Sequence, residues 1–270
     1  MADVRPLQYD IKWDVWDGMP ITDIHFKNYN IVIEFMWENS FLQNIVYEGV
    51  GLHDLDEMKS IYTDYCKHIL RNECSVMILD ETETEIIAVA LLEWMTGEWH
   101  SWTFLPLTIS KGLFQELILM KKALMDSTKR RIEADNFDCL MVHEVGFPRS
   151  LFEDESFLMC MFDVIGEVAA HMHMPRVCFI ALTAKEQYAV ELADYEECGK
   201  SIYSIYKVAG NKRPFDCLRD LDEMFAILYV LNLNPILNYQ LWPGFEAFQE
   251  SLRAKQQKER EDDLVRANEM

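Results

Sequence analysis

The feature that most limits the fold of this chain is the order in which helical and strand patterns alternate along it. Apolar residues recur every three or four positions, as in helices that bury one face, over 29–42, 57–72, 110–136, 156–173 and 185–193. Short runs rich in apolar and β-branched residues, typical of strands, lie at 74–80, 85–95, 137–147, 176–182, 201–208 and 224–233. This alternation favours one sheet covered by helices.

The order of these segments predicts the architecture more closely. With a first strand at about residues 21–26, the order is β-α-α-β-β-α-β-α-β-α-β-β. The run 74–95 contains a short polar turn and therefore predicts a hairpin. We expect an α/β domain with a mixed, mostly antiparallel central sheet of about seven strands and helices on both faces.

The charge of the chain excludes two classes of partner. The sequence has 46 acidic against 25 basic residues and a formal net charge of -21. Nucleic acid phosphates and anionic lipid headgroups are repelled by such a field, so we expect neither nucleic acid nor membrane as a partner. The 50% of hydrophobic residues is enough to fill a substantial core. A polyanionic ligand would need a specific cradle of amides and basic side chains.

Targeting and metal signals are weak. The first residues lack the basic flank and apolar run of a signal peptide, and no uncharged apolar run approaches the roughly 20 residues that span a bilayer. The seven cysteines show no C-x-x-C spacing, which fits reduced thiols in the cytoplasm. His171 and His173 do not align on one helical face, so we expect no metal. We expect an N-terminal extension at 1–20, the domain at 21–250 and a charged tail at 251–270.

Several segments resemble one family. They are 29–42 ahead of the pair Gly51-Leu52, 75–80 leading into 85–91, and 203–206 near the end. In these segments and in the order of its elements, the chain resembles the GNAT acetyltransferase superfamily over about 21–233, and within it the insect arylalkylamine N-acetyltransferase-like branch. The resemblance implies transfer of an acetyl group from acetyl-CoA to a small amine. It also implies that amides at the start of the helix after the central strand hold the pyrophosphate.

The loop at that position departs from the family pattern, which reads Arg/Gln-x-x-Gly-x-Gly/Ala. Here the stretch 145–157 lacks the glycine pair and places three acids at 153–155. Arg149 keeps a basic position, Ser150 or Ser156 offers a hydroxyl, and the backbone near Val145 offers amides, so these are the candidate acetyl-CoA contacts. The acids instead fit the first turn of the following helix, where they stabilise its dipole.

Candidate acid–base residues come from two places. The family's glutamate follows its first helix in a Phe-Phe-x-Asp-Glu-Pro-Leu stretch; that register falls on Ile45, which takes no proton, and Glu48 stands three residues later. The central strand offers His143 and Glu144, which we expect to point to opposite faces, and histidine has the better ordinary pKa for this task. The family's usual tyrosine falls on Val190.

These residues leave two functions open. The first is an acyl-CoA-dependent N-acyltransferase in which His143 or Glu144 draws off the proton of the amine. The second is a GNAT-like interaction module that has lost acetyl-CoA binding and whose acidic surface suits a basic protein partner. We predict an N-acetyltransferase-like protein with a degenerate cofactor loop and weak or lost catalysis, and we keep the basic-partner module as the alternative.

Overall fold

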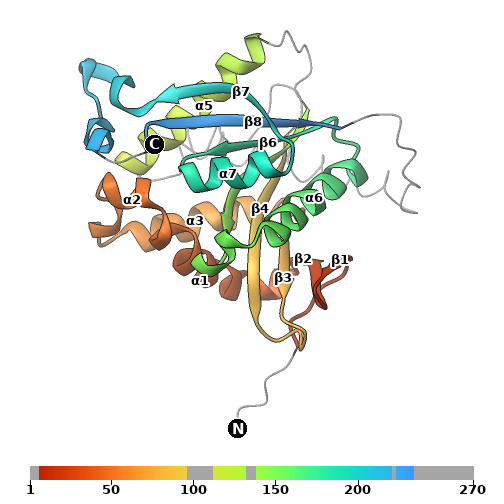
Figure 1. Ribbon diagram of the computed structural model, residues 1–270. Helices are drawn as coiled ribbons and strands as arrows, with labels where there is room; N and C mark the ends of the chain where they lie inside the picture. The colour runs from red at the N-terminus through yellow and green to blue at the C-terminus, as the bar shows by residue number, and fades with distance from the viewer. Residues whose placement is uncertain (1–5, 96–111, 132–137, 221–222, 234–270) are drawn as a thin grey trace, which may run out of the picture.

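The computed structural model describes residues 6–95, 112–131, 138–220 and 223–233. Its centre is one eight-stranded sheet in the order β1-β2-β3-β4-β5-β6-β8-β7 (Figure 1). This confirms the predicted mixed α/β domain, with one strand more than expected. Within the described ranges no helix combines the length and apolar composition that crossing a bilayer requires. The predicted charged tail at 251–270 lies outside them.

The sheet has eight strands, five of which lie where the apolar runs predicted them. Their bounds are β1 Lys12–Trp16, β2 Met19–Asp23, β3 Val76–Leu79, β4 Ile86–Met95, β5 Cys139–Gly146, β6 Arg176–Ala181, β7 Glu196–Ile202 and β8 Phe225–Asn232. All neighbours pair antiparallel except β5 and β6, which are parallel and are joined through a helix. The parallel pair at the middle of the sheet is where the site lies.

Helices cover both faces of the sheet, as expected. One face packs against α1 (Tyr29–Asn39), α2 (Ile45–Gly49), α3 (Met58–Leu70) and α5 (Leu113–Arg131). The other packs against α6 (Glu155–His171) and α7 (Ala184–Leu192), which lie in front of the sheet in Figure 1. Each face has its own core, because alternate residues of every strand point to opposite sides.

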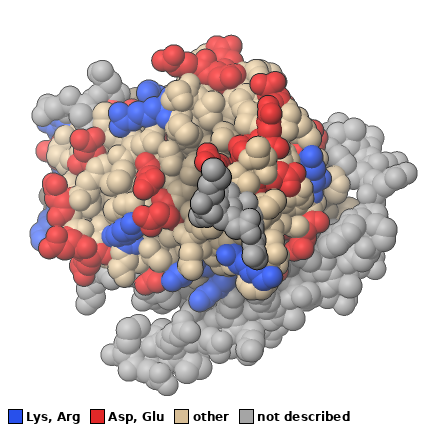
Figure 2. Space-filling model, turned by 90° about the horizontal axis from the view of Figure 1, so that it is seen from below, with Lys and Arg blue, Asp and Glu red and all other residues tan. Residues whose placement is uncertain are grey.

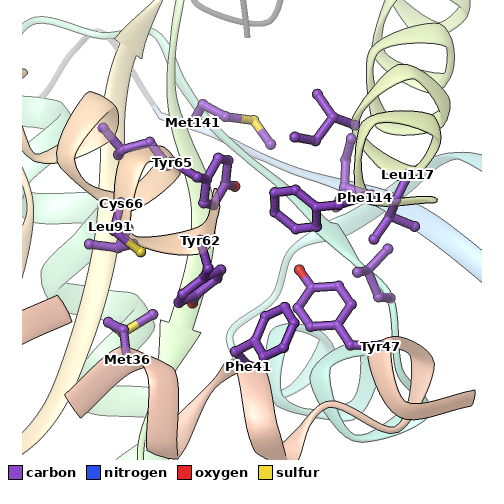
Figure 3. Packing of buried hydrophobic residues seen from close by; sticks show 14 of the residues in the cluster. Met36, Phe41, Tyr47, Tyr62, Tyr65, Cys66, Leu91, Phe114, Leu117 and Met141 are labelled. Atoms are coloured by element: carbon purple, nitrogen blue, oxygen red, sulfur yellow. The ribbon is translucent and has the colours of Figure 1, made fainter. Parts of the chain in front are cut away.

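Aromatic rings fill the core beneath α1, α2, α3 and α5. Figure 3 shows Phe41, Tyr47, Tyr62, Tyr65 and Phe114 pointing toward one another from four segments of the chain. Their ring centroids lie 4.9 to 6.4 Å apart, the range of favourable aromatic pairs. The tyrosine hydroxyls bring polar groups into this core, and two of them bond to the central strand.

Two terminal features of the sheet differ from the prediction. The first strand was expected at about 21–26, but a hairpin begins at Lys12, and the boundary expected at residue 20 falls inside it. The strand expected at 201–208 runs instead from Glu196 to Ile202, and residues 203–205 form a 3-10 turn. That turn is fixed because Tyr203 is buried and its hydroxyl donates to the Leu182 carbonyl at 2.7 Å.

Candidate functional site

The sheet opens at its middle. The pairing of β5 with β6 covers only three residues, from Leu140 opposite Val177 to Val142 opposite Phe179. Beyond that point β5 continues to Gly146 while still paired with β4, and β6 continues to Ala181 while paired with β8. The two strands therefore separate toward their carboxyl ends, which in α/β sheets is the usual place for a ligand.

A cavity of about 300 Å³ lies at this opening. Its walls come from the end of α1, from α2, from the loop after β5 and from the start of α7. Its lining residues are Asn39, Ser40, Gln43, Asn44, Ile45, Glu48, Val145, Arg149, Phe152, Thr183, Lys185, Glu186 and Glu223. We call it the split cavity. Three carboxylates and two basic side chains share its walls, so it is polar and slightly acid-rich.

Helix α6 begins just after Arg149 and Phe152, which line the split cavity, and a side chain of this protein already caps its start. Asp154 precedes the helix in an extended conformation, and its Oδ1 accepts from the Phe157 amide at 3.0 Å. Glu153 and Glu155 flank it and are exposed. The predicted capping role of these acids is thus seen for Asp154. A carboxylate stands where the family pattern would place a phosphate.

The four candidate cofactor residues divide into two pairs. Val145 and Arg149 line the split cavity. Ser150 is exposed on the turn before α6 and is not one of the lining residues described. Ser156 lies beside the N-terminal hairpin, where its Oγ accepts from Trp16 Nε1 at 3.2 Å. The structure brings two of the four residues to the cavity.

The start of α7 forms the opposite wall, and its amides are also taken by side chains of this chain. Thr183 and Glu186 form a capping box, in which Glu186 Oε2 accepts from the amides of Leu182 at 2.6 Å and Thr183 at 2.9 Å. Glu223 Oε2 accepts from the Ala184 amide at 2.6 Å. Both helices at the opening therefore meet carboxylates of this protein at their N-termini.

Glu186, one of the ionisable residues that line the split cavity, has a raised pKa. Burial, and after it the nearby Glu144 carboxylate, raise the pKa of Glu186 to about 7. Its Oε1 also accepts from Asn44 Nδ2 at 3.4 Å. A carboxyl that titrates near neutral pH and faces a cavity is suited to accept a proton from a bound ammonium.

His143 and Glu144 lie on the same face, which contradicts the expectation that they point to opposite faces. Leu91 pairs with Glu144 and Leu92 with Val142, so His143 is an additional residue on β5. Such a bulge re-aims side chains. His143 Nε2 lies 2.6 Å from Glu93 Oε2, and its Nδ1 lies 3.3 Å from the Tyr65 hydroxyl. Its side chain is fully buried and does not line the split cavity.

Glu144 is buried beside His143 but has one connection to the split cavity. Its carboxylate accepts from the Tyr47 hydroxyl, from Ser40 Oγ at 2.9 Å and from Lys121 Nζ at 3.4 Å. Both Glu144 and Lys121 are almost fully buried. Ser40 lines the split cavity and so stands between Glu144 and the ligand space. The Ser40 hydroxyl therefore links the buried Glu144 carboxylate to the split cavity.

The first turn of α2 carries the remaining candidate. Glu48 is exposed and lines the split cavity, as does Ile45, whose side chain occupies the family's glutamate register. Sequence reasoning missed Glu186, Lys185 and Glu223. The Thr183-to-Glu186 capping-box spacing just after a strand would have marked the first of these. No comparable signal in the sequence marks Glu223, which reaches the site from another segment.

No family model and no curated protein sequence matches the chain. Among solved structures it is similar to arylalkylamine N-acetyltransferase 2 from Aedes aegypti, with a TM-score of 0.68 and 15% identity over 81% of this chain and 100% of that one. It is also similar to the Drosophila melanogaster polyamine N-acetyltransferase, described as catalysing formation of N-acetylagmatine, with a TM-score of 0.66 and 14% identity over 80% and 100%. The chain therefore has the GNAT fold, in a divergent form.

Proposed function

We propose that this protein is an N-acetyltransferase-like protein of the GNAT fold that binds a small amine in the split cavity and has weak or lost transfer from acetyl-CoA. The amine is favoured by the carboxylates of Glu48, Glu186 and Glu223, which attract an ammonium group. The similar structures are described as enzymes that act on amines. Binding of an amine is therefore the part of the family's function that these carboxylates still support.

One observation carries the loss of acetyl-CoA binding. The Asp154 carboxylate already caps α6, with Glu153 and Glu155 on either side, at the helix end where a pyrophosphate would dock. Like charges a few ångströms apart repel by about 1 kcal/mol even when well solvated. Arg149 and Lys185 are the basic side chains in the cavity wall, and Lys185 Nζ lies over the Phe152 ring at 5.2 Å. The residues present do not fit the cofactor at this position.

Calorimetric titration with acetyl-CoA tests this proposal. We expect no heat from the wild-type protein at millimolar acetyl-CoA. Asp154→Asn keeps a good helix cap and removes the charge. The triple variant Glu153→Gln, Asp154→Asn, Glu155→Gln should therefore gain measurable binding. Low-micromolar binding by the wild-type protein that weakens in Arg149→Ala would show that the acidic loop does not block the cofactor.

A second candidate, residual acyl transfer to a bound amine, is favoured by Glu186. Its pKa of about 7 lets it take a proton from an ammonium near neutral pH. A rate of thiol release that depends on both an amine and acetyl-CoA, and that falls in Glu186→Gln, would support it. No amine-dependent release at any pH from 6 to 9, a range of about 1 to 2 units around that pKa, would exclude it.

The alternative of a basic protein partner stays a prediction. Figure 2 shows acidic side chains on the face seen from below, but basic side chains lie among them. That face carries no continuous acidic surface among the residues described there. The split cavity offers more specific chemistry than this surface does.

A further inference from the structure

A second cavity lies at the carboxyl end of α6, and its lining shares no residue with the split cavity. The N-terminal hairpin packs along this helix: Trp16 contacts Phe157 near its start, and Trp13 contacts His171 at its end, with ring centroids 5.3 Å apart. Between the hairpin, the start of β3 and the last turn of α6 is a space of about 250 Å³. Its lining residues are Ile11, Lys12, Trp13, Asp23, Glu73, Cys74, Glu167, Val168, His171 and Met172. We call it the hairpin cavity.

Most of the surface of the hairpin cavity is apolar. The Trp13 ring forms one wall, and Val168, Met172 and Cys74 form others. An indole face attracts a cation that lies over it, and an apolar wall buries an apolar body. The cavity is therefore suited to a ligand that has both a positive charge and an apolar body.

The charged side chains that line the hairpin cavity are mostly acidic, with Asp23, Glu73 and Glu167 against one lysine, Lys12. Glu167 lies on the last turns of α6 and lines the cavity, and burial, followed by the Asp14 carboxylate, raises its pKa. A bound cation would relieve this repulsion. The carboxyl end of α6 at His171 also presents the negative end of the helix dipole. The Asp23 carboxylate is bonded to the amides of Asp10 and Ile11 and is less available.

We propose that the hairpin cavity binds a small organic cation with an apolar body, held by the Trp13 ring, the Glu167 carboxylate and the carboxyl end of α6. None of the residues that line this cavity also lines the split cavity, so the site is separate. It would let the protein hold such a cation without contact with the opening between β5 and β6. The proposal does not depend on the function proposed above.

Nuclear magnetic resonance with the 2-phenylethylammonium ion tests this site. The indole N–H signal of Trp13, assigned with Trp13→Phe, should shift and saturate as the ion is added. The uncharged 2-phenylethanol has a similar apolar body and should bind at least about tenfold more weakly, because it lacks the cation–π and carboxylate interactions.

Two variants separate this site from the split cavity. Glu167→Gln should weaken the Trp13 response at least about fivefold, whereas Glu186→Gln, in the split cavity, should leave it unchanged. Glu167 is exposed, so its replacement leaves the fold intact, and circular dichroism checks this. The absence of a saturable Trp13 shift, an equal response to the alcohol, or an unchanged affinity in Glu167→Gln would each overturn the proposal.

Discussion

The two faces of the sheet bury different kinds of side chain. The face under α6 and α7 is packed almost entirely by apolar residues, such as Phe162 and Ile165. The face under α1, α3 and α5 buries the pairs Glu93–His143 and Lys121–Glu144 among its tyrosines. Buried ions cost stability unless they are well paired. Ionisable residues on the central strand can therefore belong to the core, where only a neighbour such as Ser40 connects them to the split cavity.

Lys121→Met should have the largest effect on stability. It tests whether the buried charges of Lys121 and Glu144 stabilise one another. The variant leaves Glu144 buried without its cation, and we expect the free energy of unfolding to fall by about 3–5 kcal/mol. Urea denaturation measures this loss. The double variant Lys121→Met, Glu144→Gln should recover much of it, since no unpaired charge remains. A loss below about 1 kcal/mol in the single variant would mean that the pair contributes little.

The same substitution, glycine to alanine, can be made on each face of the sheet and so compares how tightly the two faces are packed. A Cβ at Gly146, on β5, would lie 2.6 Å from the Sδ of the buried Met36, so Gly146→Ala should cost about 1–3 kcal/mol by overpacking. A Cβ at Gly166, inside α6, meets its nearest atom at 3.5 Å, an ordinary contact. Gly166→Ala should therefore be neutral or stabilise by up to about 1 kcal/mol.

Thermal unfolding followed by circular dichroism measures both glycine variants. Equal destabilisation of the two would show that space at the end of α1 does not limit this part of β5. A stabilised Gly166→Ala beside a destabilised Gly146→Ala would show that the face with the buried charges is the more tightly constrained of the two.

Much of the fold could be predicted from sequence because the long periodic segments are local signals. Helices α1, α3, α5, α6 and α7 and the hairpin of β3 and β4 lie where the patterns predicted them. The first hairpin was missed, although its turn at Asp17 and Gly18, both with positive φ, is a strong signal. The prediction of a strand at 203–206 was wrong because the Tyr203 hydroxyl is buried and donates to the Leu182 carbonyl, which is distant in the sequence.

The candidate site was harder to predict because its geometry depends on contacts between distant segments. The additional residue on β5 turns His143 and Glu144 to one face, and strand periodicity alone cannot show a bulge. Glu186 and Glu223 reach the split cavity from segments that carry no motif of the family. By contrast, the capping by Asp154 is a local interaction, and the sequence predicted it.

Glu186→Gln should give the smallest effect. It tests whether the folded protein destabilises the charged form of Glu186, for which the described part of the chain provides no paired cation like those of the core charges. Burial and the Glu144 carboxylate raise the pKa of Glu186 from an ordinary value of 4.5 to about 7. The folded protein therefore binds a proton more tightly than the unfolded chain does. This contribution to stability is complete below pH 4.5 and is lost as the pH rises to about 7.

Glutamine keeps the carbonyl oxygen of the capping box and cannot titrate. The stability of Glu186→Gln relative to the wild-type protein should therefore rise between pH 4.5 and 7, the range of the shift, by an amount on the order of 1 kcal/mol for this half-buried group. Urea denaturation at several pH values measures the difference. Glu155→Gln, at the exposed start of α6, separates loss of this carboxyl from loss of a surface charge. A pH-independent difference would mean that the pKa of Glu186 is the same in the folded protein as in the unfolded chain.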